Sequence, residues 1–408
     1  MEDVFAITGT VTIKEREGRF LKSGGDWLYD NEIASVSPGV ADGALVQVKD
    51  FDGYLMGTGY INRRSKITVR MLTRGEERPD SGLFASRVRS CIRVRRVYSD
   101  LSCCRLLFGE ADGFPGLVAD LYSGYLVCQI TALGMERLFP AILPVIRQEL
   151  AAAGVAVKGV LLRNDEKVRE KEGLALEKKF SGEAFDTRVP IVENGVKYIV
   201  DVMDGQKTGF FLDQKENRRA VQRLVAGLAG IKEDVRVLDC FTHTGSFALN
   251  AARAGATQVL AVDASDLAIA QAQENARING VSDRVTFLTE DVFDFLPQQV
   301  QAGKQYDLVI LDPPAFTKAR SSIKAAARGY RQINSDGMQL VAPGGYLATC
   351  TCSHFMDPEL FRKTIEQAAH IAHRRLSQVY FGTQAPDHTY RWGMSESLYL
   401  KFYIFCLD

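Results

Sequence analysis

The sequence predicts a multidomain α/β protein with a small N-terminal β-barrel, a central α+β domain and a C-terminal Rossmann-like, doubly wound domain. Glycines break the first 75 residues into short strand-like segments. Hairpin and helix patterns then follow up to about residue 189. From residue 235 onward, short β-branched runs alternate with helical patterns, as is typical of a parallel sheet covered by helices. We therefore place the domains at residues 1–76, 77–189 and 190–408.

The composition is that of an ordinary globular protein, with 408 residues of which 46% are apolar and 25% charged. Fifty basic and fifty acidic residues give a net charge of zero, which argues against attraction of the whole molecule to nucleic acid but not against a local basic face. No run approaches the roughly 18 apolar residues of a membrane span, and no signal peptide is apparent. The eight cysteines lack framework-like spacing, so we expect reduced thiols in a cytoplasmic protein.

The N-terminal segment carries basic loops beside aromatic residues. Strands are expected at 44–48 and 67–72, and Arg63, Arg64 and Lys66 lie in the loop between them. Cations and stacking surfaces on a small barrel are compatible with RNA contact. A solvated barrel surface explains the same pattern, and for this segment alone it is the better interpretation.

Residues 83–98 are predicted to form a helix that carries five arginines and no acid. Arg89, Arg93 and Arg96 fall on one face by their i, i+4 and i+7 spacing. Charge runs are usually solvated faces, but the absence of acids makes a phosphate-facing stripe an equally good interpretation.

A second α+β unit follows this helix. We expect a hairpin at 117–130, an amphipathic helix at 138–152 and a strand at 157–162. The mixed charges of 164–179 indicate a solvated connector. A further hairpin at 191–202, a glycine-containing loop at 204–214 and a helix at 215–227 form the first part of the last domain.

A βαβ unit begins the doubly wound part of the last domain. Strand 235–239 precedes a helix at 247–254 and a strand at 258–262, after which Asp263 follows. Ligands of such units bind at the carboxyl ends of the strands, where an acid accepts the ribose hydroxyls. The turn contains neither G-x-G-x-x-G nor G-x-x-x-x-G-K-[ST], the two motifs that bind phosphates, so we do not expect it to bind a pyrophosphate. S-adenosylmethionine is the favoured cofactor, and a doubly wound domain with an unremarkable turn is the alternative.

Two further strand ends carry acids. Asp266 is expected to cap a helix that runs to Asn279, and strand 285–288 follows it. Asp291 could accept the adenine amino group or cap the next helix, and the sequence leaves both open. Strand 306–311 ends in Asp312 followed by two prolines, which fix a rigid loop and hold this carboxylate at the ligand edge of the sheet.

The strand at 346–349 leads into two thiols, Cys350 and Cys352. No second ligand pair stands near at metal-site spacing, so no metal is expected, and a disulfide between residues two apart is geometrically poor. Inert buried thiols and a nucleophile remain as interpretations. Strands at 376–381 and 397–406 close the sheet. His388, in a substrate-side loop at 384–388, could be a base, although a loop histidine is more often a bystander.

Six motifs together identify a resemblance. In order they are GEADGFPGL (109–117), DGQKTGFFLDQ (204–214), VLDCFTHTGSF (237–247), VDAS (262–265), DPPAF (312–316) and TCTCS (349–353). This set closely resembles the class I S-adenosylmethionine-dependent methyltransferases that make 5-methylcytosine in 23S ribosomal RNA and carry an N-terminal PUA domain. The resemblance runs nearly end to end. It implies a PUA domain, a central α+β domain and a seven-stranded Rossmann-like catalytic domain.

The resemblance also implies roles for individual residues. Cys352 matches the catalytic cysteine, Asp312 is placed to bind the N3/N4 edge of the base, and Cys350 is treated as structural. RNA binding is expected of the basic residues Arg63, Arg64, Lys66, Arg89, Arg93 and Arg96. The expected cofactor-binding residues are Phe210, Gln214, Asp239, Phe241, Thr242, Thr244, Gly245, Asp263, Ala264, Asp291 and Asp312.

The implied chemistry is addition of the Cys352 thiolate to C6 of cytosine, after which C5 attacks the sulfonium methyl group. Pro313 and Pro314 stand where other cytosine methyltransferases have a second thiol, so the group that releases the product is left open. Both faces of the base must be reached, which requires an unstacked target. The alternatives are a guanine-N methyltransferase acting on ribosomal RNA and a non-catalytic PUA-containing RNA-binding or assembly factor. No membrane partner is expected, and a homodimer is left open.

Overall fold

The computed structural model describes residues 3–317 and 319–408, which divide into two compact units. The first unit takes the chain up to Ile191, together with Val200–Leu212 and Pro386–Ser397. The second unit consists of Val192–Ile199, Asp213–Ala385 and Leu398–Asp408. Pro386–Ser397 therefore belongs to the first unit although the strands on either side of it belong to the second.

The first unit begins with a six-stranded sheet in the order β2-β6-β5-β4-β1-β3. Its neighbouring strands pair antiparallel except β1 and β4, which are parallel. Apolar side chains such as Val11, Val46, Ile61 and Val69 form its core. This confirms the predicted small β domain. The strands are β1 (Ile7–Ile13), β2 (Trp27–Tyr29), β3 (Ile33–Val36), β4 (Leu45–Lys49), β5 (Leu55–Ile61) and β6 (Ile67–Met71), and the short helix α1 is Arg19–Lys22.

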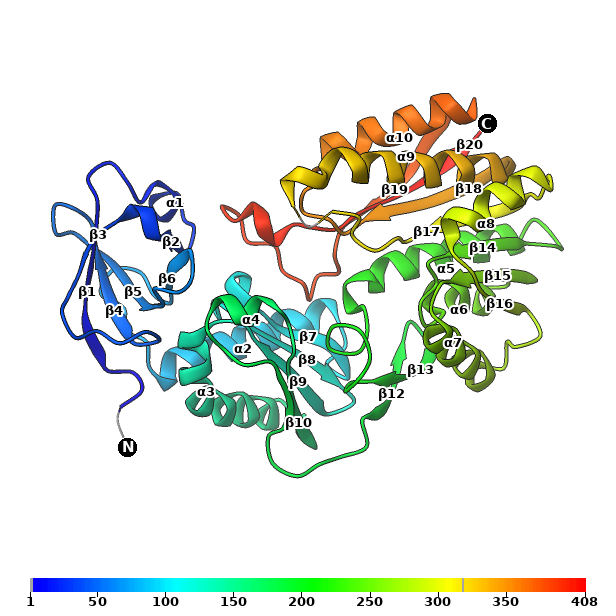
Figure 1. The fold of residues 1–408 in the computed structure, drawn as a ribbon. Coiled ribbons are helices and arrows are strands. Elements are labelled where there is room, and N and C mark those ends of the chain that lie inside the picture. The colour runs from blue at the N-terminus through cyan, green and yellow to red at the C-terminus, as the bar shows by residue number, and fades with distance from the viewer. Residues whose placement is uncertain (1–2, 318) are drawn as a thin grey trace. The chain divides into compact units, whose positions relative to one another are not determined.

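The central part of the first unit is a five-stranded sheet in the order β11-β10-β9-β8-β7, with the helices α2 and α3 packed together (Figure 1). Only β9 and β10 pair in parallel, because α3 provides the crossover between them. The elements are α2 (Ser81–Tyr98), β7 (Cys103–Phe108), β8 (Leu117–Tyr122), β9 (Tyr125–Ile130), α3 (Leu133–Ala152), β10 (Gly159–Asn164), α4 (Val168–Lys171) and β11 (Glu177–Phe180). The predicted α+β arrangement is confirmed.

The expectation of a solvated connector at 164–179 holds only in part, because two of its charged residues are buried. Arg169 and Glu172 are each only 2% exposed. Arg169 donates to the carboxylate of Glu136 at 2.9 Å, and Glu172 accepts a hydrogen bond of 2.7 Å from the amide of Asn62 in the β domain. Arg169 and Glu172 are thus bonded in the interior and Glu172 connects the segment to the β domain, whereas Glu166, Lys167, Glu170 and Lys171 are exposed.

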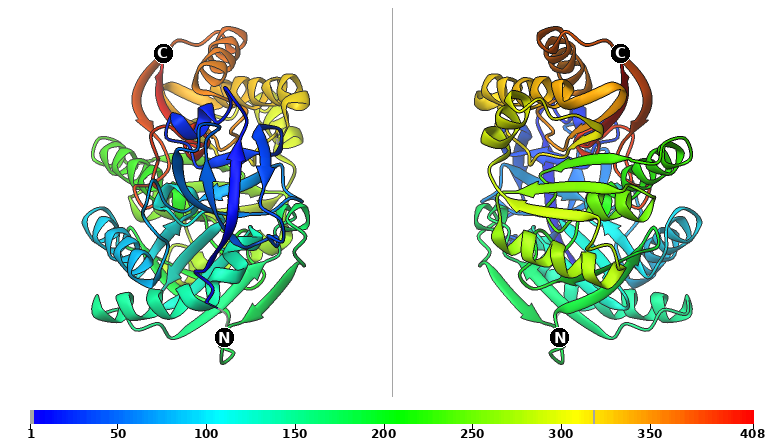
Figure 2. Two further views of the ribbon diagram at one scale, coloured as in Figure 1. Left: turned by 90° about the vertical axis from the view of Figure 1, so that its left-hand side faces the viewer. Right: turned by 90° about the vertical axis from the view of Figure 1, so that its right-hand side faces the viewer.

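The second unit contains a seven-stranded sheet in the order β16-β15-β14-β17-β18-β20-β19. β20 pairs antiparallel with β18 and β19 on either side of it, and the other neighbouring strands pair in parallel. Helices α5, α6 and α7 pack as one layer and α8, α9 and α10 as the other, with the sheet between them (Figures 1 and 2). The strands are β14 (Arg236–Cys240), β15 (Gln258–Asp263), β16 (Val285–Thr289), β17 (Tyr306–Leu311), β18 (Val341–Thr351), β19 (Leu376–Gly382) and β20 (Lys401–Leu407).

Side-chain caps set the starts of several of these helices. Ser265 accepts from the backbone N–H of Ala268 at 3.3 Å and caps α7, so the expectation that Asp266 is the cap is wrong and Asp266 is the first helical residue. Gly280 ends α7 in the left-handed conformation at φ 65°, as predicted. The helices are α5 (Lys215–Ala229), α6 (Ser246–Arg253), α7 (Asp266–Asn279), α8 (Val292–Gln301), α9 (Ile323–Leu340) and α10 (Pro358–Ala372).

Among the strand boundaries that differ from the prediction, two bear on the site. Strand β18 extends to Thr351, so Cys350 lies inside the strand rather than after it. Strand β20 begins at Lys401 rather than at residue 397, because residues up to Ser397 belong to the segment of the first unit. Cys352 is thus the first residue beyond the end of β18.

The second unit contains a fully buried ion pair between Arg218 of α5 and Glu193, the last residue of β12 (Arg188–Glu193). Both side chains are 1% exposed, and the guanidinium donates two hydrogen bonds, of 2.6 and 2.9 Å, to the carboxylate. The carboxylate raises the pKa of Arg218 although burial opposes it. Removal of either partner leaves an uncompensated buried charge.

We predict that Arg218→Met lowers the free energy of unfolding by about 3–5 kcal/mol. Arg219→Ala is the matched control, because Arg219 is the next residue of α5 and its side chain is 45% exposed beside Glu216. It should change the free energy by less than about 1 kcal/mol. Urea unfolding followed by circular dichroism measures both. Equal losses in the two variants would contradict the prediction.

Candidate functional site

The loop after β14 is a tight turn with unusual backbone conformations. Phe241, His243 and Gly245 have φ angles of 62°, 49° and 80°. The backbone N–H of Thr242 donates to the carbonyl of Val262 at 3.0 Å, which ties the loop to β15. Left-handed conformations at non-glycine residues are rare because they cost energy, and they persist only where contacts with the surrounding structure enforce them. The turn thus has a fixed shape at the carboxyl end of the central strand.

The buried carboxylate of Asp239 stabilises this turn through hydrogen bonds. Its side chain is fully buried, and one carboxylate oxygen accepts from the hydroxyl of Thr242 at 2.5 Å and from the N–H of Ala248 at 2.9 Å. The other oxygen is buried with no protein partner among the described residues. Burial raises the pKa of Asp239 to about 7. The nearby carboxylates of Asp312 and Asp263 add to this shift.

Asp263 ends β15 beside the same turn. Its carboxylate accepts from the N–H of His243 at 2.8 Å and from the N–H of Ser265 at 3.0 Å. These two backbone donors fix its orientation while the side chain remains partly exposed. An oriented carboxylate at this position has lone pairs left for hydroxyl groups of a ligand.

A second cluster lies where β17 and β18 end. The two strands pair in parallel with Leu311 opposite Thr349, so Asp312 and Cys350 follow at neighbouring positions. The thiol of Cys350 donates to Asp312 at 2.9 Å. The amide of Gln214 donates to the same carboxylate oxygen at 3.0 Å. Burial raises the pKa of Asp312 to about 6, and it raises the pKa of the Cys350 thiol as well.

Gln214 is held in turn by Asn217, whose amide donates to the Gln214 side-chain oxygen at 2.6 Å and to the carbonyl of Thr383 at 3.3 Å. Gln214 was expected among the cofactor-binding residues. The structure places it against Asp312 and Cys350, where it orients the carboxylate.

Cys352 is partly exposed, whereas Cys350 is fully buried. The residues on either side of Cys352 are anchored. The hydroxyl of Thr351 donates to the hydroxyl of Tyr330 at 2.8 Å, and the hydroxyl of Ser353 donates to the carbonyl of Thr317 at 2.9 Å. The backbone around this thiol is therefore fixed to α9 and to the loop after β17.

Aromatic rings connect the two clusters. Phe316 of the Asp-Pro-Pro loop lies with its ring centroid 4.5 Å from that of Tyr330 and 6.4 Å from that of Phe241 in the turn after β14. The turn after β14, the Asp-Pro-Pro loop and Tyr330, which bonds to Thr351, thus pack together within the second unit. None of Tyr330, Asn217 or Lys401 was predicted as a site residue, since none stands in a recognised motif and long-range pairing brings each of them here.

Comparison with known proteins gives a consistent result. Residues 105–387 match the S-adenosylmethionine-dependent methyltransferase family, and residues 11–74 match a PUA-like domain. Proteins named ribosomal RNA large subunit methyltransferase I are similar along nearly the whole chain. The one from Shewanella denitrificans is 38% identical over 96% of this chain and 97% of its own length. The one from Aeromonas salmonicida is 35% identical over 95% and 96%.

This chain belongs to the S-adenosylmethionine-dependent methyltransferase family. The enzyme therefore uses S-adenosylmethionine. Among solved structures, a methyltransferase from Streptococcus mutans matches with a TM-score of 0.79 at 21% identity, covering 98% of this chain and 100% of that chain. A methyltransferase complexed with SAH matches with the same values. These structural likenesses concern the fold.

The turn after β14 fits S-adenosylmethionine. Asp239 contributes a buried carboxylate oxygen and Thr244 a buried hydroxyl, and neither has a hydrogen-bond partner among the described residues. Gly245 has a φ angle of 80°, and a Cβ there would lie 3.1 Å from that of Ala272, so a side chain at this position would be both strained and crowded. We propose that this turn and Asp263 hold the cofactor, with the ribose hydroxyls on the Asp263 carboxylate.

The remaining predicted cofactor residues have varied surroundings. Asp291 caps α8 by accepting from the N–H of Phe293 at 2.8 Å, so its capping role is confirmed while its contact with adenine stays a prediction. Ala264 is exposed next to Asp263. Phe210 is 4% exposed and belongs to the first unit, and its contact with the cofactor also remains a prediction.

The loop at 384–388 was expected on the substrate side, and the structure assigns its last three residues to the first unit, as part of Pro386–Ser397. His388 is 3% exposed and its ring bonds to Asp387 at 2.8 Å. The guanidinium of Arg95 donates to the carbonyl of Asp387 at 2.8 Å, and Thr389 donates to Asp112 at 2.9 Å. These contacts within the first unit anchor the segment to the central domain, so His388 is a structural residue.

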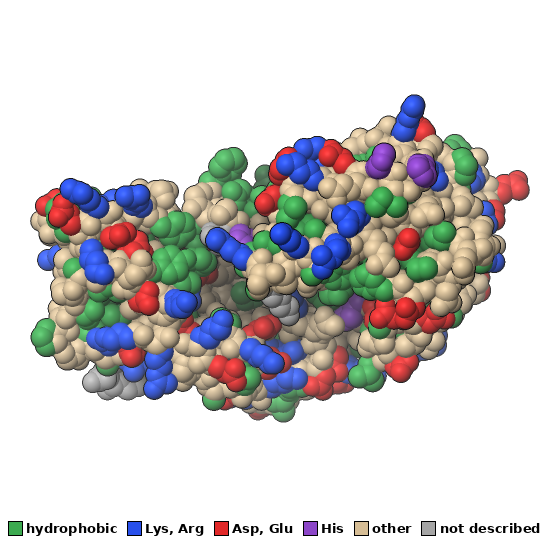
Figure 3. Space-filling model, turned by 45° about the horizontal axis from the view of Figure 1, so that its top comes forward, with side chains coloured by type: hydrophobic (Ala, Val, Ile, Leu, Met, Phe, Trp, Pro, Cys, Tyr) green, Lys and Arg blue, Asp and Glu red, His purple; other side chains and the backbone are tan. Residues whose placement is uncertain are grey.

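The predicted RNA-binding side chains are all exposed. Arg89 is paired with Glu149 at 2.7 Å and Arg63 with Asp42 at 2.8 Å, whereas Arg93 forms no ion pair among the described residues. Figure 3 shows basic side chains interspersed with acidic and apolar ones on the face it draws. RNA contact by these residues therefore remains a proposal.

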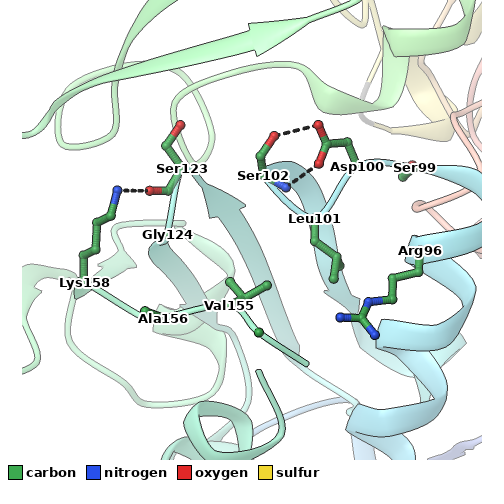
Figure 4. Close-up of a pocket in the computed structure, with 11 residues that line it drawn as sticks. Arg96, Ser99, Asp100, Leu101, Ser102, Ser123, Gly124, Val155, Ala156 and Lys158 are labelled. Atoms are coloured by element: carbon green, nitrogen blue, oxygen red, sulfur yellow. Dashed lines mark hydrogen bonds between the residues drawn. The ribbon is translucent and has the colours of Figure 1, made fainter. Parts of the chain in front are cut away.

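A separate pocket of about 790 Å³ lies in the central domain (Figure 4). Arg96 and Lys158 line it, but Lys158 already donates to the carbonyl of Ser123 at 2.8 Å and Asp100 is bonded to Ser102. Arg96 is the single predicted site residue there, so this pocket is not the cofactor site. In the chain described, no three His, Cys, Asp or Glu side chains gather as metal ligands would, and no helix has the length and apolarity to cross a membrane.

We predict that Asp263→Ala raises the Kd for S-adenosylmethionine about tenfold to a hundredfold, because hydrogen bonds to a charged group are lost. Isothermal titration calorimetry measures the change. Asp266→Ala is the control, since Asp266 is exposed three residues further along. Because Asp263 also accepts from His243, circular dichroism must show an intact fold. Unchanged affinity would remove the proposed ribose contact.

Proposed function

We propose that this methyltransferase transfers a methyl group to C5 of a cytosine in large-subunit ribosomal RNA through a covalent bond between Cys352 and C6. The observation that carries the proposal is the arrangement at the ends of β17 and β18, where the partly exposed thiol of Cys352 follows the buried Cys350–Asp312–Gln214 cluster. The similarity to proteins named ribosomal RNA large subunit methyltransferase I supports the choice of substrate.

Cytosine C5 is a weak nucleophile, so the reaction needs prior activation. Addition of the Cys352 thiolate to C6 makes C5 an enamine-like carbon that can be methylated. Bound S-adenosylmethionine supplies an electrophilic methyl group on its sulfonium. Loss of the C5 proton and elimination of the thiolate then restore the aromatic ring and free the enzyme.

Asp312 is proposed to bind the N3/N4 edge of the cytosine and to stabilise the adduct electrostatically. A carboxyl group with a pKa near 6 can accept from the N4 amino group when ionised and donate to N3 when protonated. Gln214 and Cys350 both donate to the same oxygen of Asp312, which leaves the other oxygen for the base. Cys350 thereby has a structural part in the proposal.

The thiolate and the methyl donor must approach the base from its faces, so the target nucleotide has to be unstacked. A PUA-like domain and the exposed arginines of α2 support RNA as the partner. Phosphate contacts by these arginines would position the RNA, while Asp312 would select the base.

We predict that RNA substituted with 5-fluorocytidine forms a covalent complex with the enzyme in the presence of S-adenosylmethionine, because fluorine at C5 blocks the final elimination. The complex should survive denaturing gel electrophoresis and be absent in Cys352→Ala. Cys350→Ala is the matched control and should retain it, since that thiol is buried.

An adduct in Cys352→Ala that is lost in Cys350→Ala would transfer the nucleophilic role to Cys350. Methylation that persists in Cys352→Ala, with methylguanosine in the digested RNA, would instead identify a guanine methyltransferase. Absence of S-adenosylmethionine binding would indicate a non-catalytic RNA-binding factor.

We also predict that replacing Arg93 and Arg96 with alanine weakens RNA binding and flattens its salt dependence. Each lost phosphate contact should reduce the slope of log K against log salt concentration by about 0.7 for single-stranded RNA. Arg147→Ala, on the exposed side of α3, is the control. The test is to measure RNA affinity by filter binding at salt concentrations between about 50 and 300 mM. An unchanged slope would exclude this face from the interface.

A further inference from the structure

Lys401 is a buried cation next to the proposed nucleophile. It is the first residue of β20, pairs opposite Thr351 across the sheet, and is 2% exposed. Thr351 immediately precedes Cys352, so the register of β18 and β20 brings the lysine to this end of the strand. A lysine is almost never fully buried unless it is paired or has a special role.

The hydrogen bonds of Lys401 go to backbone carbonyls rather than to an acid. Its ammonium donates to the carbonyl oxygens of Ser353 and Tyr399, each at 2.9 Å. No carboxylate among the residues the structure describes forms an ion pair with it. The positive charge is therefore buried without a bonded counter-ion, which is costly unless a negative charge develops nearby.

Several other titratable groups lie near Cys352 in the described part of the chain. Cys350 lies on β18 and is bonded to Asp312, the hydroxyl of Tyr330 on α9 accepts from Thr351, His354 follows two residues after Cys352, and Asp357 caps α10. Lys401 interacts electrostatically with Cys352, Asp357 and Cys350. Burial lowers the pKa of Lys401 to about 8, so the ammonium is still mainly protonated at pH 7. Coulombic coupling is mutual, so this ammonium favours the thiolate of Cys352 as much as the thiolate favours the ammonium.

We propose that the Lys401 ammonium stabilises the thiolate of Cys352 and fixes the Ser353 carbonyl beside it, as a positioning residue for methyl transfer. The inference rests on the proposed function, in which Cys352 is the nucleophile. The thiol proton leaves to solvent and Lys401 keeps its own proton throughout, so the S–H bond breaks before the bond from sulfur to C6 forms. A thiolate beside a cation is the reactive form that nucleophilic cysteines require.

The test measures alkylation of Cys352 by iodoacetamide between pH 5 and 10, followed by mass spectrometry of the tryptic peptide. Lys401→Gln removes the charge but keeps N–H donors, Lys401→Met removes both, and Lys401→Arg keeps the charge. In the two neutral variants we expect the midpoint of alkylation to rise by about one pH unit, which is about a tenfold slower reaction at pH 7. Lys401→Arg should return it toward the wild-type value.

Two internal controls accompany this measurement. Cys406 lies on the same strand and is also partly exposed, so its alkylation midpoint should not move in any variant. Lys304→Met removes an exposed lysine of the same unit and should leave Cys352 unchanged. If Lys401→Met fails to fold by circular dichroism, Lys401→Gln provides the neutral comparison.

An unchanged Cys352 midpoint in the folded neutral variants would overturn the inference, as would a shift that Lys401→Arg does not reverse. The alkylation needs neither RNA nor methyl transfer, so it separates the two proposals. A wild-type adduct with 5-fluorocytidine RNA and an unmoved midpoint would overturn the role of Lys401 alone. A shifted midpoint without any adduct in the wild type would overturn the proposed function, and with it the use of this thiolate in methyl transfer.

Discussion

The parallel register between β17 and β18 is the constraint on which the site depends. Pairing of Leu311 with Thr349 makes Asp312 and Cys350 neighbours, and their hydrogen bond of 2.9 Å follows directly. Each of the two prolines after Asp312 disfavours the helical conformation of the residue before it, so the backbone at Asp312 stays extended and the carboxylate stays at the edge of the sheet. A shift of either strand by one residue would turn that strand's side chain to the other face and separate Asp312 from Cys350.

At this edge of the sheet, hydrogen bonds from one polar side chain to the next restrict their conformations. Asn217 holds Gln214, Gln214 holds Asp312, and Asp239 holds the turn opposite. Each buried group has its orientation set by another, which keeps reactive atoms in place before any ligand arrives. Burial also raises the pKa of Asp239 and Asp312 into the range where protons can be exchanged near neutrality.

The segment at 386–397 interrupts the second unit between two of its strands. It leaves the second unit after β19, bonds to the central domain through Asp387 and Thr389, and returns to form β20. Lys401 is the first residue of that strand, so the path of this segment decides where the lysine begins its pairing with Thr351. Local sequence gives no sign of such an excursion, because the contacts that hold the segment lie hundreds of positions away in the chain.

The sequence by itself determined the element order, the β domain and the seven-stranded α/β domain, because hydrophobic periodicity and glycine and proline punctuation are local properties. It also located Asp263, Asp312 and Cys352 at strand ends, since each follows a buried run. Only the tertiary structure decided that Gln214 faces Asp312, that Arg169 and Glu172 are buried, and that Lys401 adjoins Cys352. Those relations depend on strand register and on charge pairing between distant segments, and neither leaves a periodic signal in the sequence.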